Sequence, residues 1–189
     1  SLGLYFQKLV NKNFKVAVDY PIDAKRFPKK NKILRCGISW RSTNKLIGHK
    51  KSIDLVLLRE VLALENIEFI NLQFSDVKNE VNNLENSMKR KIFNSHDIDN
   101  FNDIDGIASL IKTCDFVITI SNSNAHISGK LGVKTFLLLP KSDGKLWYWG
   151  QSEDKEIIWY PSIIPIRQTK NSDWKDCIDR LIQLIGNVL

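Results

Sequence analysis

One short polar loop contains the residue types that point most directly to chemistry. It follows an apolar run at 116–120 and consists of Ser121, Asn122, Ser123, Asn124, Ala125 and His126. Polar side chains in such a position cap helices, and a helix N-terminus offers free backbone N–H groups with a partial positive charge. Small residues leave that backbone open, and the ring of His126 can add a donor. The loop therefore predicts a binding site for a diphosphate.

The same spacing also fits an ordinary capped helix whose histidine packs locally, so both interpretations stay open from the pattern alone. The sequence contains no G-x-G-x-x-G and no G-x-x-x-x-G-K-[ST] motif. A dinucleotide-dependent dehydrogenase and a P-loop nucleotide hydrolase are therefore disfavoured.

Two acidic triplets, Asp97–Asp99 and Asp103–Asp105, have a spacing with which some metal-dependent transferases hold a divalent cation. Carboxylate oxygens are suitable ligands for Mg²⁺ or Mn²⁺. The second triplet directly precedes an amphipathic segment, where aspartates cap a helix and interact favourably with its dipole. We expect this capping role, and we expect no metal and no other cofactor.

Cysteines and histidines are too widely separated to form a metal site. The cysteines form no C-x-x-C pair and are odd in number, which argues for free thiols in a reducing compartment. No apolar run approaches the ~20 residues that cross a bilayer. These features predict a cytoplasmic protein without a membrane span. The residues concerned are Cys36, Cys114, Cys177, His49, His96 and His126.

Positive charge is concentrated in one part of the chain. The sequence carries a net charge of +7, but ten basic and no acidic residues lie between Ala24 and Lys51, so the rest has a net charge of −3. Such an excess favours an anionic partner, for example a nucleic acid, a phospholipid or a phosphorylated small molecule. A length of 189 residues with 43% hydrophobic content predicts one domain with a real core.

The elements that must position the polar loop follow from the hydrophobic pattern. From about residue 32, short apolar runs that predict strands alternate with amphipathic segments that predict helices. This alternation indicates an α/β domain with a Rossmann-like parallel sheet and helices on both faces. Ligands bind such sheets beyond the carboxyl ends of the strands. We expect strands at 33–40, 67–72, 91–94, 116–120, 135–139 and 163–166, and helices at 52–64 with Ser52 as its cap, from 76, from 103 or 105 to 113, before Gly132, and from 172 or 173.

Four segments together resemble a known family, the glycosyltransferases of the GT-B fold, which have two Rossmann-like lobes. The resemblance is to the donor-binding lobe. It is closest to the glycosyltransferase-like C-terminal region of bacterial tetratricopeptide-repeat proteins, and more distant to lipopolysaccharide heptosyltransferases and O-linked N-acetylglucosamine transferases. The segments are DFVITISNSNAHISGKLGVKTFLLLP (115–140), GISWRSTN (37–44) followed by HKKSIDL (49–55), FINLQ (69–73) and IIWYPSIIPIRQ (157–168).

The resemblance implies that the chain is the nucleotide-sugar-binding lobe of an inverting, metal-independent glycosyltransferase. His126 matches the family's histidine at the start of the helix that meets the donor diphosphate, and Lys51 matches a basic residue that contacts phosphate. The diphosphate site is expected to include Asn122, Ser123, Asn124 and Ala125 as well. Arg41, Ser42, Gln73 and Ser121 are expected in the donor pocket.

The resemblance also implies a second lobe. The general base and the site for a protein or glycan acceptor are expected on a missing N-terminal lobe, so no catalytic residue is assigned in this chain. We expect residues 1–31 to connect to that lobe and residues 32–189 to form the donor-binding lobe. The chain begins at Ser1 and its one methionine is Met88, which fits a processed chain or a fragment.

Two other functions stay open. Ser121 stands where heptosyltransferases commonly have an aspartate, so a catalytically degenerate nucleotide- or glycan-binding module is an alternative. The basic window at 24–51 leaves nucleic-acid binding as a further alternative, but no recognised motif accompanies it, and we expect no nucleic-acid partner. A set of aromatic residues either closes over the donor or packs beneath loops. This set is Trp147, Trp149, Trp159 and Tyr160.

Overall fold

Parallel strands form one five-stranded sheet in the part of the chain that the structure describes, in the order β2-β1-β3-β4-β5. The structure is a computed structural model that describes residues 22–29, 33–95, 98–99, 102–141, 143–150, 157 and 159–188. Every neighbouring pair is parallel, which confirms the predicted Rossmann-like sheet. The strands are β1 (Leu34–Ser39), β2 (Ile67–Asn71), β3 (Phe116–Ile120), β4 (Lys134–Leu139) and β5 (Ile163–Arg167).

The strand predicted at 91–94 is reduced to a single bridge on the outer side of β2. Phe93 pairs in parallel with Ile70. Its N–H donates to Phe69 O at 2.8 Å, and its carbonyl accepts from Asn71 N at 2.8 Å. If this bridge is counted as a strand, the sheet has the order of a classical dinucleotide-binding fold, 3-2-1-4-5-6.

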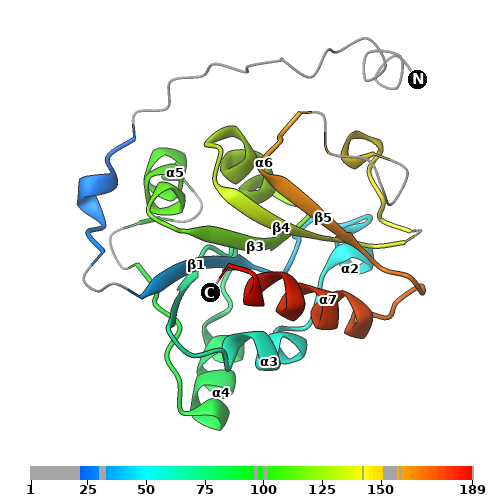
Figure 1. The fold of residues 1–189 in the computed structure, drawn as a ribbon, viewed down its shortest axis with the longest axis horizontal. Coiled ribbons are helices and arrows are strands. Elements are labelled where there is room, and N and C mark those ends of the chain that lie inside the picture. The colour runs from blue at the N-terminus through cyan, green and yellow to red at the C-terminus, as the bar shows by residue number, and fades with distance from the viewer. Residues whose placement is uncertain are drawn as a thin grey trace.

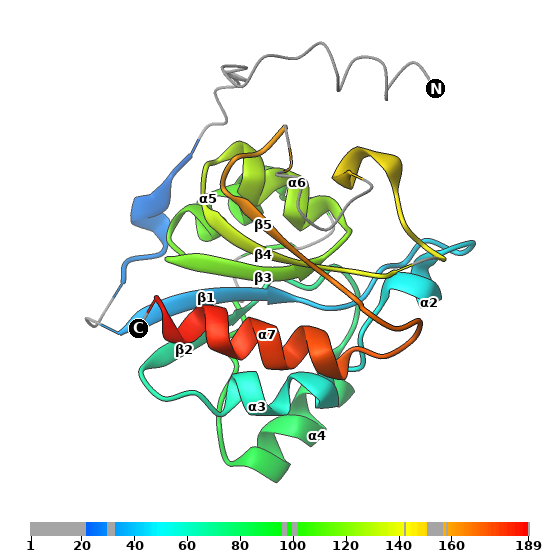
Figure 2. The ribbon, with the colours of Figure 1, turned by 45° about the vertical axis from the view of Figure 1, so that its right-hand side comes forward.

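Helices cover both faces of the sheet, as Figures 1 and 2 show. One face is covered by α3 (Arg59–Leu62), α4 (Lys78–Met88) and α7 (Lys175–Gly186), and the other by α5 (Ile104–Lys112) and α6 (Ser123–Lys130). All five residues of β3 are buried because the strand is covered on both sides. Shorter elements are η1 (Ala24–Arg26), α2 (Gly48–Lys51), η2 (Leu55–Leu58) and η3 (Trp147–Trp149).

The first predicted helix begins three residues later than expected, and its predicted cap is wrong. Asp54, not Ser52, caps η2, because its carboxylate accepts from Val56 N at 3.1 Å. The Ser52 hydroxyl instead donates to Gly48 O at 2.7 Å and accepts from Ser42 N at 2.9 Å. The four-residue helix α2 was not predicted, since it is too short to show a helical period.

Of the starts expected for two later helices, one is confirmed and the other differs. Asp103 accepts from Gly106 N at 2.6 Å and is the cap of α5. For α7, which was expected to start at Ser172 or Asp173, the N-cap residue is Trp174 and makes no side-chain capping bond. Asp173, one residue earlier, accepts from Lys175 N at 2.9 Å. The first D-x-D triplet cannot be compared, because Asp97 lies outside the described residues.

Part of the predicted connector packs on the domain. Within the described residues 22–29, η1 lies beside α5. Asp23 N donates to Ser109 Oγ of α5 at 2.9 Å. Phe27 is buried in the cluster of apolar side chains that includes those of α5. The remainder of the connector lies outside the described residues, and the division of the chain at residue 31 stays a prediction.

All three cysteines are buried free thiols, as expected. Burial raises the pKa of Cys114 and that of Cys177 to about 12. None of the described helices combines the length and the apolar character needed to cross a membrane.

Helix α6 passes so close to the chain before β5 that one of its positions accepts only glycine. A Cβ on Gly129 would lie 2.6 Å from Tyr160 Cγ. We expect Gly129→Ala to lower the free energy of unfolding by about 1–3 kcal/mol, because the helix or the tyrosine must move. Urea denaturation measures the change.

Gly186→Ala is the matched control for this substitution, because apart from its own helix backbone and chain neighbours no described atom lies within 4 Å of the added methyl. This variant should be neutral or slightly stabilising, since alanine has the higher helix propensity. A Gly129→Ala protein as stable as the Gly186→Ala protein would contradict the close approach of α6 and Tyr160.

Candidate functional site

The candidate site lies where the connections of two neighbouring strands diverge. β1 leads toward α3 on one face of the sheet, and β3 leads into α6 on the other face (Figure 1). In open parallel sheets, ligands bind at such a switch point, beyond the carboxyl ends of the strands. A cavity of about 350 Å³ opens there, and we call it the switch-point cavity. It is lined by Arg41, Ser42, Thr43, Asn44, Phe74, Asn122 and Ser123.

A smaller and mainly apolar cavity of about 150 Å³ adjoins the first. The two share Phe74 and Ser123 in their walls, so they are neighbours of different chemical character. This apolar side cavity lies between the end of β2, the start of α5 and the first turns of α6. It is lined by Leu72, Phe74, Ile104, Ile107, Ser123, Asn124 and Ile127.

The N-terminus of α6 meets the switch-point cavity and is held by buried polar groups. Asn122 caps the helix by accepting from Asn124 N at 3.1 Å. Its amide also accepts from Thr119 Oγ1 at 3.0 Å and donates to Ser39 Oγ at 3.1 Å. The cap is therefore tied to the last residues of both β1 and β3. Backbone N–H groups of the first turn and the helix dipole together favour an anion at this point.

Gln73 shapes the cavity without lining it. Its Oε1 accepts from Trp40 N at 2.9 Å and from Arg41 N at 2.8 Å. Its Nε2 donates to Arg41 O at 3.0 Å and to Phe74 O at 2.9 Å. The side chain is 1% exposed and its amide is fully used by backbone groups. Gln73 therefore positions the loop after β1. These bonds occupy its amide and so argue against the predicted direct contact with a ligand.

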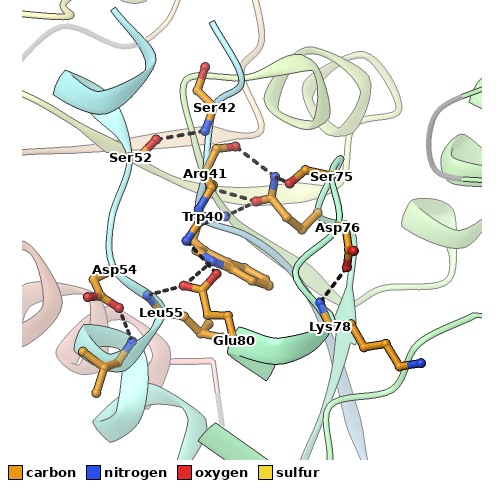
Figure 3. A network of polar contacts seen from close by, with 12 residues as sticks. Trp40, Arg41, Ser42, Ser52, Asp54, Leu55, Ser75, Asp76, Lys78 and Glu80 are labelled. Carbon is orange, nitrogen blue, oxygen red and sulfur yellow. Dashed lines mark hydrogen bonds and ion pairs between the residues drawn. The ribbon is translucent and has the colours of Figure 1, made fainter. Parts of the chain in front are cut away.

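Arg41 supplies a cation at the wall of the switch-point cavity. Its Nη2 pairs with Glu80 Oε2 at 2.8 Å. Glu80 is held in turn, because its Oε1 accepts from Trp40 Nε1 at 3.2 Å and from Leu55 N at 3.4 Å, as Figure 3 shows. The Arg41 side chain is 47% exposed, so a ligand in the cavity can reach the guanidinium.

The loop after β1 is folded back onto α2 by small residues. The Ser52 hydroxyl joins Ser42 N to Gly48 O, and Figure 3 shows its contact with Ser42. A Cβ on Gly48 would lie 2.6 Å from Ser42 O, so a larger residue would push the two segments apart. This close approach gives the wall of the cavity its shape.

Lys51 is buried behind the loop and does not line either cavity described above. Its Nζ donates to Ser121 O at 2.6 Å, and the residue is 6% exposed. Burial lowers the pKa of Lys51. The bond links α2 to the end of β3 and brings a positive charge close to the start of α6. Ser121 is itself buried, and its Oγ accepts from Trp149 Nε1 at 2.8 Å.

His126 lies in the first turns of α6 among aromatic rings. Its imidazole stacks on the Trp149 indole with centroids 4.6 Å apart, and its Nδ1 is 3.2 Å from Tyr160 Oη. Tyr148 approaches the same ring at 5.3 Å. Burial, together with the nearby charge of Lys51, lowers the pKa of His126 below its ordinary value. The ring is therefore neutral at pH 7.

The structure divides the predicted site residues into two groups. Arg41, Ser42, Asn122 and Ser123 line the switch-point cavity. The others are packed around the start of α6. Among them is Asn124, which also lines the apolar side cavity and whose Nδ2 donates to Leu72 O at 2.7 Å. The sequence interpretation missed Glu80, because nothing in the polar pattern of α4 marks it as a partner of Arg41. The packed residues are Lys51, Gln73, Ser121, Asn124, Ala125 and His126.

Asp103 serves as a helix cap and pairs with Arg26 at 3.2 Å, which is the structural role expected for it. Among the residues that the structure describes, no cluster of three or more histidine, cysteine or acidic side chains has the geometry of a metal site.

Comparison with known proteins gives one distant relative and no family. The sequence matches no model of a known protein family. It is similar to Protein FlbA of Caulobacter vibrioides, with 25% identity over 148 residues. The match covers 78% of this chain and 24% of FlbA. The chain thus spans about a quarter of that relative's length, and this match does not assign it an activity.

We expect Gln73→Leu to lower the free energy of unfolding by about 2–4 kcal/mol. The substitution removes the acceptor of two backbone N–H groups, each of which costs about 1–3 kcal/mol when buried without a partner. Asn83→Leu, on the exposed side of α4, is the matched control and should change stability by less than about 0.5 kcal/mol. Urea denaturation of both variants checks this, and equal stabilities would contradict the positioning role of Gln73.

The stability of the protein should fall as the pH falls below 6.5, and His126 should cause part of that fall. The ordinary pKa of 6.5 applies to the unfolded chain, and burial lowers the pKa in the folded protein. Below pH 6.5 the unfolded state therefore binds the proton first, which favours unfolding. In His126→Asn the loss of unfolding free energy between pH 7.5 and pH 5.5 should be smaller than in the wild type. Denaturation curves at the two pH values measure it, and equal losses would refute the buried neutral imidazole.

Proposed function

We propose that this chain binds a nucleotide sugar and is the donor-binding lobe of an inverting, metal-independent glycosyltransferase. The observation that carries the proposal is the capped N-terminus of α6, which meets a cavity at the switch point of a parallel sheet with Arg41 in its wall. Backbone N–H groups and a guanidinium are the donors that bind phosphate oxygens. The resemblance of four segments to GT-B donor lobes agrees with this location.

The two adjoining cavities suit the two halves of a nucleotide. The switch-point cavity offers Arg41, Ser42 and the start of α6 to the phosphates. The apolar side cavity offers aliphatic side chains and the ring of Phe74 to a planar base. Phe74 and Ser123 line both cavities, so the two are neighbours, and in this proposal a single nucleotide extends from one into the other.

Transfer of the sugar would make the nucleoside diphosphate a leaving group, on which negative charge develops as the glycosidic bond breaks. Fixed positive groups around the oxygens lower the energy of that state. Arg41 is available in the cavity wall, while Lys51 is buried and adds its charge from behind the loop. The acceptor and its general base belong, in this proposal, to a different lobe.

The distribution of basic side chains does not favour nucleic-acid binding. In the basic window 24–51, five side chains are already paired with carboxylates within the domain, and Lys51 is buried. Paired and buried cations add little to the potential that attracts a polyanion. The five are Arg26, Lys29, Arg35, Arg41 and Lys50.

A second candidate is a binding module that keeps the nucleotide but lacks transfer activity. The hydroxyl of Ser121, the residue that replaces an aspartate common in heptosyltransferases, accepts from Trp149 and is buried. It is therefore not placed to act on a substrate. Transfer of sugar by a protein that contains both lobes would separate the two candidates, since nucleotide binding alone fits either.

We expect saturable binding of at least one of UDP, ADP and GDP, free or as a sugar conjugate, in buffer containing EDTA. Arg41→Ala should weaken binding by about tenfold or more, because a hydrogen bond to a charged group contributes about 1.5–3 kcal/mol. Lys51→Ala and His126→Ala should also weaken binding, because Lys51 holds the Ser121 carbonyl and places its charge near the start of α6, and His126 lies in the first turns of that helix. Isothermal titration calorimetry measures the affinities. Binding that disappears with EDTA would contradict the metal-independent site.

Lys45→Ala and His49→Ala are the matched controls, because both side chains are exposed and neither lines the two cavities. Both should bind nucleotides like the wild type. If no nucleotide binds while short oligonucleotides do, with an affinity that falls steeply with salt, the proposed function is wrong.

A further inference from the structure

His126 has one ring nitrogen occupied and one available. Nδ1 lies 3.2 Å from Tyr160 Oη, whereas Nε2 has no hydrogen-bond partner among the residues that the structure describes. Nδ1 and Nε2 are on different sides of an imidazole, so Nε2 points away from Tyr160. A neutral imidazole carries one N–H proton, and only the nitrogen that holds it can donate.

The orientation of this pair is fixed by packing on several sides. One face of the imidazole stacks on the buried indole of Trp149, at an interplanar angle of 26°. Trp149 is itself anchored by its bond to Ser121. Tyr160 approaches α6 directly over Gly129, where no larger residue fits. Tyr160 and His126 therefore meet with Nδ1 toward the tyrosine hydroxyl and with the imidazole packed between aromatic rings.

Two arrangements of protons are possible in this pair, and chemistry favours one. Tyr160 can donate its hydroxyl proton to Nδ1, or it can accept the proton of Nδ1–H. A phenol O–H is a stronger donor than the N–H of a neutral imidazole, and an imidazole nitrogen is a stronger acceptor than a phenol oxygen. The lowered pKa of His126 keeps the ring neutral at pH 7, so this choice exists under ordinary conditions.

We propose that Tyr160 is a positioning residue for His126: its hydroxyl donates to Nδ1 and so keeps the ring proton on Nε2, from which it can be donated to a diphosphate oxygen. The assignment of the tautomer follows from this chain's own residues. Its use toward a diphosphate rests on the proposed function. A carboxylate or phosphate near the start of α6 then meets a donor instead of a lone pair.

Long-range ¹H–¹⁵N NMR spectra of the uniformly labelled protein at pH 7.5 test the tautomer without any ligand. The sequence has three histidines, and comparison with His126→Gln identifies the signals of His126. We expect a protonated Nε2 and an unprotonated, hydrogen-bonded Nδ1 in the wild type. In Tyr160→Phe, which keeps the ring but removes the donor, the Nδ1–H form should become populated and the Nδ1 shift should move toward its value without a hydrogen bond.

Tyr148→Phe is the matched control, because Tyr148 packs on the same imidazole while its own hydroxyl interacts with Ser121 and not with His126. Its tautomer signals should be those of the wild type. Circular dichroism and thermal unfolding of both variants check that the fold is kept. A wild-type His126 with its proton on Nδ1, or a Tyr160→Phe spectrum unchanged from the wild type, would overturn the inference.

Calorimetric titration with the tightest of UDP, ADP and GDP tests the functional half. Tyr160→Phe should bind the nucleotide about threefold to tenfold more weakly than the wild type and than Tyr148→Phe. This loss corresponds to a weaker hydrogen bond from His126 Nε2 to the diphosphate. Unchanged affinity in Tyr160→Phe, alongside weaker binding in His126→Ala, would overturn the positioning role. If the wild type binds no nucleotide but shows the expected tautomer, the proposed function fails and the tautomer assignment stands.

Discussion

Strands β1 and β3 end side by side while their connections leave toward opposite faces of the sheet. This divergence determines which polar side chains the strand ends need around them. Backbone groups at the strand ends lose their neighbours, and buried groups of this kind must find other partners. Side chains provide them. Gln73 bonds the backbone of the loop after β1, Asn124 bonds the carbonyl of Leu72, and Lys51 bonds that of Ser121. The Gln73 bonds also fix the loop whose residue Arg41 lines the switch-point cavity.

The electrostatics of the site follow from this arrangement. Lys51 satisfies a strand-end carbonyl and is buried for that reason, and its charge together with burial keeps His126 neutral. Arg41, in contrast, remains half-exposed in the cavity wall and is aimed by Glu80. A buried cation, a capped helix N-terminus and an accessible guanidinium therefore lie around the start of α6, and Glu80 holds the guanidinium by its ion pair.

Much of the fold could be predicted from hydrophobic pattern. Strands such as β3 are continuous apolar runs bounded by polar residues, and aspartates such as Asp103 mark the start of helices. The pattern failed where local signals compete. Ser52 is a good cap by residue type, but a tertiary contact with Ser42 uses its hydroxyl, and the helix begins after Asp54 instead. Phe93 forms a bridge without a strand, because in residues 91–95 only its N–H and carbonyl make backbone hydrogen bonds with β2.

The sequence by itself determined the α/β class, the polar loop that becomes the start of α6, and the set of polar residues at the strand ends. These follow from local composition and period, which depend on near neighbours in the chain. Only the tertiary structure decided which of those residues line the cavity and which instead make hydrogen bonds within the protein around it. Arg41 and Gln73 are equally polar in sequence, yet one faces the cavity and the other is fully bonded to backbone. Trp40 and Arg41, whose backbone groups Gln73 bonds, lie 33 and 32 residues away from it in the sequence, so a local sequence pattern cannot predict these contacts.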